Sequence, residues 1–267
     1  MRERCLLRGA VGLLAILLLA SPAGAAASSP SPARSSAAAP DAQAALRPYR
    51  LDLADRRDLV AQTNFVQCVG ASLQTMLNVM ASGADRTAKT QSNLQTIARS
   101  LSGPTREGFQ RQGASVRGWT AALNRLGAGR YQMAGFDTLA DAMNAAAVAI
   151  ARTGKPVGLL MWSGRHAWVM TGFTATADPH RNSQFSVTGA IVFDPLYPYG
   201  SATWGKSPQP GATLSLATLS KQFVPRRHGT WAGAIPGTTD MSRLAGKYVI
   251  VEPYLPQLEQ PRYPRGL

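Results

Sequence analysis

The chain has 267 residues, of which 45% are hydrophobic and 16% charged, so it can form a substantial core and is not a wholly disordered protein. Its formal net charge of +14 favours anionic surroundings such as cell-wall polymers or a membrane surface with acidic headgroups. The basic residues are scattered, and no stripe of arginines alternates with aromatic residues, which argues against a specific nucleic-acid partner.

Residues 1–25 are predicted to be an export signal. Basic residues precede an apolar stretch from Ala10 to Ala20, and the small residues Ala23-Gly24-Ala25 offer a cleavage site. The apolar stretch is shorter than the ~20 residues that span a bilayer, so cleavage is favoured over a permanent anchor. We therefore expect a secreted or cell-envelope-associated protein.

Residues 26–46 are mostly Ala, Ser and Pro and are predicted to be a disordered linker, because they contain few large apolar side chains to bury. Residues 47–267 have the length of one larger domain or two small ones, and one domain is favoured because they show no repeat or second linker. Of the two cysteines, Cys5 lies in the predicted signal. Cys68 is therefore the only cysteine expected in the exported chain, where it has no partner for a disulfide bond.

Apolar residues at helical spacing follow Cys68, and Gly83 ends the run, so a helix is predicted to begin at the cysteine. Periodicity also predicts helices over 91–101, 115–126 and 138–152. Extended apolar runs predict strands over 157–162, 166–175, 185–193 and 248–252. Helices followed by an antiparallel sheet indicate an α+β fold.

Four residues suggest nucleophilic catalysis. Cys68 at a helix start would have its thiolate stabilised by unpaired N–H groups and the helix dipole. His166 begins one predicted strand and Asp194 ends the next, so neighbouring strands can bring a base and an orienting carboxylate together. The amide of Gln62, with the Cys68 N–H, could stabilise an oxyanion.

This order of residues resembles the papain-like cysteine peptidases. It is most similar to the double-glycine, bacteriocin-leader-processing group, cysteine-peptidase family thirty-nine, over about Asp58 to Pro195. The resemblance implies a papain-like fold with amino-terminal helices packed on an antiparallel sheet. It also implies these roles: Cys68 as nucleophile, His166 as base, Asp194 as orienting group and Gln62 as oxyanion donor.

Two features depart from that group. Val69-Gly70 follows the cysteine, where the group usually has Gly-Pro or a similar pair. The chain also has no transporter spans and no nucleotide-binding loop, which the leader-processing members commonly have. The resemblance therefore supports a secreted, stand-alone relative.

Each candidate residue also has a purely structural interpretation. Cys68 could be a small buried hydrophobe, His166 a core histidine, and Asp194-Pro195 a turn. Gln67 and Asp178 are rivals for the roles of Gln62 and Asp194. His180 and His228 are isolated, so no metal site is predicted, and no cofactor-binding loop is found.

The sequence leaves three functions open. The first is a secreted cysteine peptidase with a Cys-His-Asp triad, whose partner is a peptide or protein substrate. The second is an amidase or acyl-transferring enzyme acting on cell-wall peptides, and the third is a catalytically inactive binding module with the same fold. The long segment from Pro195 to Gly246 is expected either to border the substrate site or to be a surface excursion.

Overall fold

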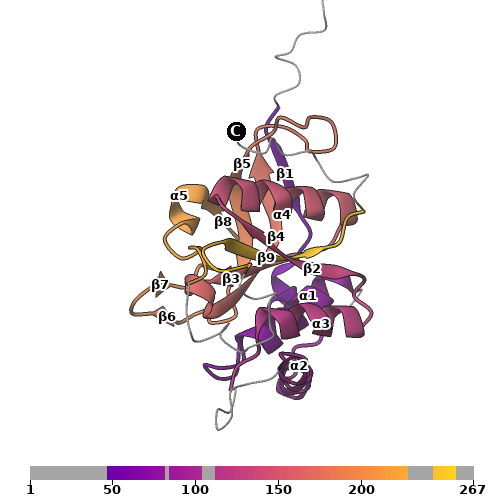
Figure 1. Ribbon diagram of the computed structural model, residues 1–267, viewed down its shortest axis with the longest axis vertical. Coiled ribbons are helices and arrows are strands. Elements are labelled where there is room, and N and C mark those ends of the chain that lie inside the picture. The colour runs from indigo at the N-terminus through magenta and orange to yellow at the C-terminus, as the bar shows by residue number, and fades with distance from the viewer. Residues whose placement is uncertain (1–46, 82–83, 104–111, 228–242, 257–267) are drawn as a thin grey trace, which may run out of the picture. The chain divides into compact units, whose positions relative to one another are not determined.

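The computed structural model describes residues 47–81, 84–103, 112–227 and 243–256, which all belong to one unit spanning residues 40–267 (Figure 1). The predicted export signal (1–25) and linker (26–46) lie outside the described residues. Within the described ranges, no helix is long and apolar enough to cross a membrane.

The predicted helices are confirmed, with small shifts at their ends. They are α1 (Cys68–Met80), α2 (Ala88–Ser100), α3 (Val116–Arg125) and α4 (Leu139–Thr153). The fold also contains the short helix α5 (Leu216–Leu219) and two single-turn 3-10 helices, η2 (Arg56–Asp58) and η3 (Trp162–Gly164). α2 begins three residues earlier than expected because Thr87 caps it by accepting a hydrogen bond from the N–H of Thr90. α4 ends at Gly154, which is left-handed with a φ of 62°.

The main sheet has seven strands, in the order β2-β9-β3-β4-β5-β8, with β1 paired to β4 beside that path. All the pairings are antiparallel. The strands are β1 (Tyr49–Asp52), β2 (Tyr131–Phe136), β3 (Val157–Met161), β4 (His166–Ala175), β5 (Val187–Phe193), β8 (Ala212–Ser215) and β9 (Tyr248–Pro253), and a separate hairpin contains β6 (Gly200–Ser201) and β7 (Gly205–Lys206).

Helices cover both faces of the sheet (Figure 1). On one face, α4 packs on alternate residues of the central strands, such as Leu159 and Trp168. On the other face, α1 and α3 pack on the residues between them, such as Leu160 and Val169, and α2 packs on α1 and α3. Because both faces are covered, β3 is buried along its whole length and has no polar alternation. The expected α+β class is confirmed, although the helices do not all lie on one face.

β4 is the central element for the site because it begins at His166 and has three neighbours. β3 pairs with its first half, β1 with its second half, and β5 runs along the other edge. The close approach of β1 requires a glycine at Gly172, where an added Cβ would lie 2.2 Å from the Leu51 carbonyl oxygen. This pairing fixes the far end of the strand whose first residue is His166.

Candidate active site

Cys68 is the first residue of α1, as predicted, and is partly exposed. The side chain of Gln67, which precedes the helix, forms no capping hydrogen bond. Instead, Gln95 of α2 accepts a hydrogen bond from the N–H of Gly70 at 2.8 Å. A Cβ on Gly70 would lie 2.8 Å from the Gln91 carbonyl oxygen and 2.9 Å from the Gln95 Cβ. The small residue two positions after the cysteine therefore lets α2 cross directly over the start of α1.

Two buried glutamines of α2 also fix the loop that precedes Cys68. Gln91 accepts a hydrogen bond from the N–H of Thr63 and donates one to the carbonyl oxygen of Ala61, both at 2.9 Å. Gln95 donates to the carbonyl oxygen of Val66 at 2.8 Å. Neither glutamine was predicted to support the site; their spacing of four along a predicted helix is the only sign in the sequence that they share a face.

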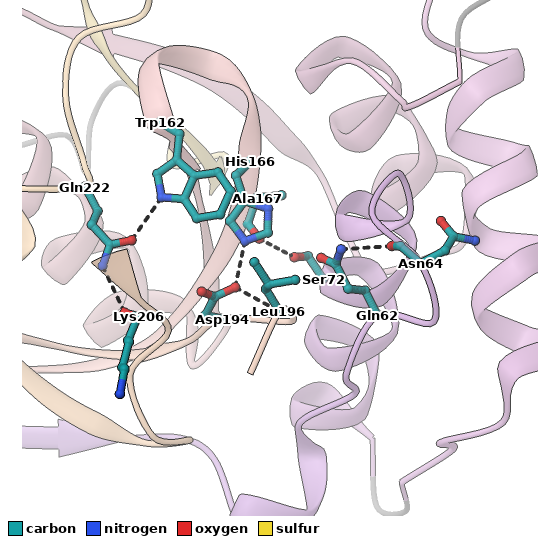
Figure 2. Close-up of polar contacts among 10 residues, drawn as sticks. All are labelled: Gln62, Asn64, Ser72, Trp162, His166, Ala167, Asp194, Leu196, Lys206 and Gln222. Atoms are coloured by element: carbon teal, nitrogen blue, oxygen red, sulfur yellow. Dashed lines mark hydrogen bonds and ion pairs between the residues drawn. The ribbon is translucent and has the colours of Figure 1, made fainter. Parts of the chain in front are cut away.

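His166 is 4% exposed and forms a hydrogen bond from Nε2 to Oδ1 of Asp194 at 2.6 Å (Figure 2). The N–H of Leu196 donates to the same oxygen at 2.8 Å. Asp194 is 1% exposed, and its Oδ2 has no hydrogen-bond partner among the described residues. This carboxylate therefore fixes one ring nitrogen and leaves Nδ1 as the nitrogen that can serve Cys68.

A second hydrogen bond joins the helix of Cys68 to the strand of His166. Ser72, one helical turn after the cysteine, donates from its hydroxyl to the carbonyl oxygen of Ala167 at 3.1 Å (Figure 2). Since residues four apart lie on the same side of a helix, the side of α1 that carries Cys68 faces the beginning of β4.

The electrostatics of His166 reflect both neighbours. Burial by itself lowers the pKa of the imidazole, but hydrogen bonds with Asp194 and Cys68, and the Coulombic effects of the same two residues, outweigh it and raise the pKa to about 9. The protonated imidazolium is therefore the favoured form at neutral pH. A positively charged ring beside a thiol stabilises the thiolate, which is the reactive form of cysteine.

Gln62 is anchored beside Asp194 through its backbone, because its N–H donates to the Pro195 carbonyl oxygen at 2.7 Å. Its side-chain Nε2 donates to the carbonyl oxygen of Asn64 at 2.8 Å, and its Oε1 is buried with no partner among the described residues (Figure 2). One of the two Nε2 hydrogens is thus engaged, and the other is available to a further acceptor.

The rival residues face elsewhere. Gln67 accepts a hydrogen bond from the hydroxyl of Thr63. Asp178 accepts from the N–H of His180 at 2.9 Å and pairs with Arg181, so it belongs to the loop after β4. In the described ranges, no group of three His, Cys, Asp or Glu residues could bind a metal ion.

The segment after Asp194 returns to the site through Gln222. The indole of Trp162, a residue the sequence analysis did not single out, stacks on the imidazole of His166 with centroids 4.0 Å apart and an interplanar angle of 21°. Gln222 accepts a hydrogen bond from the indole N–H at 2.9 Å (Figure 2). Part of the segment between Pro195 and Gly246 therefore lies next to the candidate site.

Comparison with known proteins gives a structural likeness and no match by sequence. No protein-family model matches the chain, and no curated protein matches it. Among solved structures, the chain is similar to the peptidase domain of Streptococcus ComA, a bi-functional ABC transporter involved in a quorum-sensing pathway. The TM-score is 0.33 at 14% identity, and the match covers 73% of this chain and 98% of the ComA domain.

Proposed function

We propose that this protein is a cysteine-type peptidase of the papain-like class, with Cys68 as nucleophile, His166 as base, Asp194 as orienting group and Gln62 as oxyanion donor. One observation carries the proposal: the buried 2.6 Å hydrogen bond that Nε2 of His166 donates to Asp194, in a histidine whose pKa Cys68 also raises. A cysteine at a helix start, a histidine and a buried carboxylate in series form the arrangement that activates a nucleophilic thiol.

In the first half of the reaction, the Cys68 thiolate attacks the carbonyl carbon of a peptide bond, and the carbonyl electrons move to the oxygen. When the tetrahedral intermediate collapses, the C–N bond breaks and the His166 imidazolium gives its proton to the leaving amine. The product is a thioester between Cys68 and the acyl part of the substrate. Asp194 keeps the ring oriented and stabilises its charged form.

In the second half, neutral His166 removes a proton from water as the water attacks the thioester. The C–S bond then breaks, which releases a carboxylic acid and restores the thiolate and the imidazolium. Both oxyanions would be stabilised by the Cys68 N–H and by the second N–H of the Gln62 amide. No cofactor or metal takes part in these steps.

We further propose that the enzyme acts outside the cytoplasm, where its positive net charge, +14 for the full chain and +12 without residues 1–25, favours anionic cell-wall or membrane surfaces. The same charge favours a second candidate function, in which the thioester is formed on a cell-wall peptide and passed to water or to an amine. Release or exchange of fragments from purified cell-wall peptides would distinguish this function from general peptide hydrolysis.

The test is alkylation of Cys68 with iodoacetamide from about pH 4 to about pH 9 in the wild type and in His166→Ala. An ordinary thiol reacts appreciably only near its pKa of about 8.5, whereas a thiolate paired with an imidazolium reacts far below it. We expect reaction in the acidic range for the wild type and its loss in His166→Ala. Ordinary thiol behaviour in both proteins would contradict the proposed catalytic site.

Turnover of a fluorogenic peptide mixture then tests hydrolysis itself. We expect activity in the wild type and none in Cys68→Ala. A reactive thiol without turnover of the peptides or of cell-wall fragments would favour the inactive binding module.

A further inference from the structure

The turn before β4 has an unusual backbone. Trp162 and Ser163 both have positive φ values, 56° and 54°, in the left-handed region that non-glycine residues rarely adopt. Gly164 follows with a φ of 97°. Because the arrangement is unfavourable by itself, the surrounding contacts must maintain it, and its effect is to bring the Trp162 indole against the His166 ring.

Gln222 binds Trp162 from two directions. Its carbonyl oxygen accepts from the Trp162 backbone N–H and its side-chain oxygen from the indole N–H, both at 2.9 Å. The Gln222 amide then donates to the carbonyl oxygen of Lys206 in β7 at 3.2 Å (Figure 2). The indole is therefore fixed by the segment that follows the candidate site and by the β6–β7 hairpin.

The imidazole has contacts on its edges and on one face. Asp194 fixes the Nε2 edge, and the side of α1 that carries Cys68 faces the start of β4, from which the ring extends. The single hydrogen bond to Asp194 leaves the imidazole able to rotate about that hydrogen bond. A flat aromatic surface at 4.0 Å and 21° removes that freedom, and the electron-rich indole face also attracts a protonated ring.

We propose that Trp162 is a positioning residue for catalysis: with Gln222 it holds the imidazole plane of His166 so that Nδ1 faces Cys68 while Nε2 stays on Asp194. This inference rests on the proposed function. Trp162 acts through His166 and needs no contact with the substrate.

The experiment measures iodoacetamide alkylation of Cys68 against pH in the wild type, Trp162→Ala, Trp162→Phe and Trp204→Ala. Trp162→Ala destabilises the imidazolium that stabilises the thiolate. The acidic limb of the plot of alkylation rate against pH should therefore shift to higher pH by about 0.5 to 1 unit. On that limb the rate falls about three- to tenfold. Trp162→Phe retains an aromatic face and should restore most of the loss.

Trp204 provides the control because it is a half-buried tryptophan in the turn of the β6–β7 hairpin, and this hairpin binds Gln222 through the backbone carbonyl oxygen of Lys206 rather than through the Trp204 indole. Trp204→Ala should leave the alkylation profile unchanged. Circular dichroism and thermal unfolding verify that each variant is folded. If Trp162→Ala does not fold, Gln222→Met decides: a shift in the same direction supports the inference and an unchanged profile overturns it.

The outcomes separate the two proposals. A wild-type profile in Trp162→Ala, or an equal loss in Trp162→Ala and Trp204→Ala, overturns the positioning role and leaves the peptidase proposal intact. A wild-type protein whose thiol is unreactive in the acidic range overturns the proposed function and the positioning role with it.

Discussion

The hydroxyl of Ser72 donates a hydrogen bond of 3.1 Å to the carbonyl oxygen of Ala167, and this contact joins α1 to β4 next to the two residues on which the proposed chemistry depends. Ser72 is completely buried, and no charge takes part in the contact. The Ser72 contact therefore contributes to the site by fixing the position of α1 relative to β4.

Ser72→Ala should therefore lower both stability and thiol reactivity. We expect a loss of about 0.5–1.5 kcal/mol in the free energy of unfolding, which is typical of one buried hydrogen bond, together with slower alkylation of Cys68 at acidic pH. Urea unfolding and iodoacetamide kinetics measure the two effects. Ser102→Ala is the control, since Ser102 is buried and donates to Ala98 at 2.7 Å in a different part of the fold. It should lower stability alone; equal slowing of alkylation in both variants would refute a local role for Ser72.

Removal of the Asp194 carboxylate should lower the pKa of His166. The hydrogen bond that the ring donates to Asp194 is the largest of the effects that raise this pKa to about 9. NMR titration of the imidazole should show a high pKa in the wild type, a clear decrease in Asp194→Ala and a smaller decrease in Asp194→Asn, whose amide can still bind the ring. Since the chain has three histidines, the His166→Gln spectrum assigns the signal. An unchanged pKa in Asp194→Ala would contradict this account.

The same shift predicts how stability depends on pH. The folded pKa of about 9 exceeds the unfolded histidine value of about 6.5, so the folded state binds the proton more tightly. The resulting stabilisation is fully present below about pH 6.5 and is lost as the pH rises to about 9. Urea unfolding across this range should show a decrease in the wild type that is reduced in Asp194→Ala. Parallel curves would show that another group causes the decrease.

Gln62→Ala should separate two reactions of the same thiol. Alkylation by iodoacetamide forms no tetrahedral oxyanion, so its rate should stay near that of the wild type. Peptide hydrolysis does form one, and kcat should fall about 100- to 1,000-fold if Gln62 is a donor. Gln67→Ala is the matched control, because the Gln67 side chain binds Thr63. A larger loss of hydrolysis in Gln67→Ala than in Gln62→Ala would reverse the two assignments.

Gly70→Ala should destabilise the protein although alanine is the better helix former. The added methyl would lie 2.8 Å from a backbone oxygen of α2, and such overpacking costs about 1–3 kcal/mol against a gain of about 1 kcal/mol in helix propensity. α2 must then move with the Gln91 and Gln95 contacts, so alkylation of Cys68 should slow as well. Gly127→Ala is the control: its φ of 76° makes alanine unfavourable, but nothing lies within 4 Å. A neutral Gly70→Ala would mean that α2 adapts freely.

The helices and central strands could be predicted because local patterns define them. β4 has the predicted bounds, His166 to Ala175, since an unbroken apolar run follows a turn. β2 was missed: its sequence contains Ala and Gly, and it is stabilised by β9, which is more than one hundred residues away along the chain. A short pattern carries no information about such a partner.

The pairing of His166 with Asp194 and the place of Cys68 at the start of α1 were predictable from motif order, whereas the contacts that support them were not. Gln91 and Gln95 have the polarity of surface residues, and only the crossing of α2 over Gly70 buries them. The stacking of Trp162 depends on a left-handed turn that its sequence does not favour. The residues that hold a reactive group in place are selected by tertiary contacts, and these leave little trace in a single sequence.

The pairing of β1 with the second half of β4 has a consequence for how the molecule can be tethered. Tyr49 lies opposite Ala175, nine positions along the strand from His166. At about 3.3 Å per residue, the two ends of β4 are about 30 Å apart. The described part of the chain therefore begins at the end of β4 remote from His166, so a group attached at Tyr49 would lie away from the candidate site.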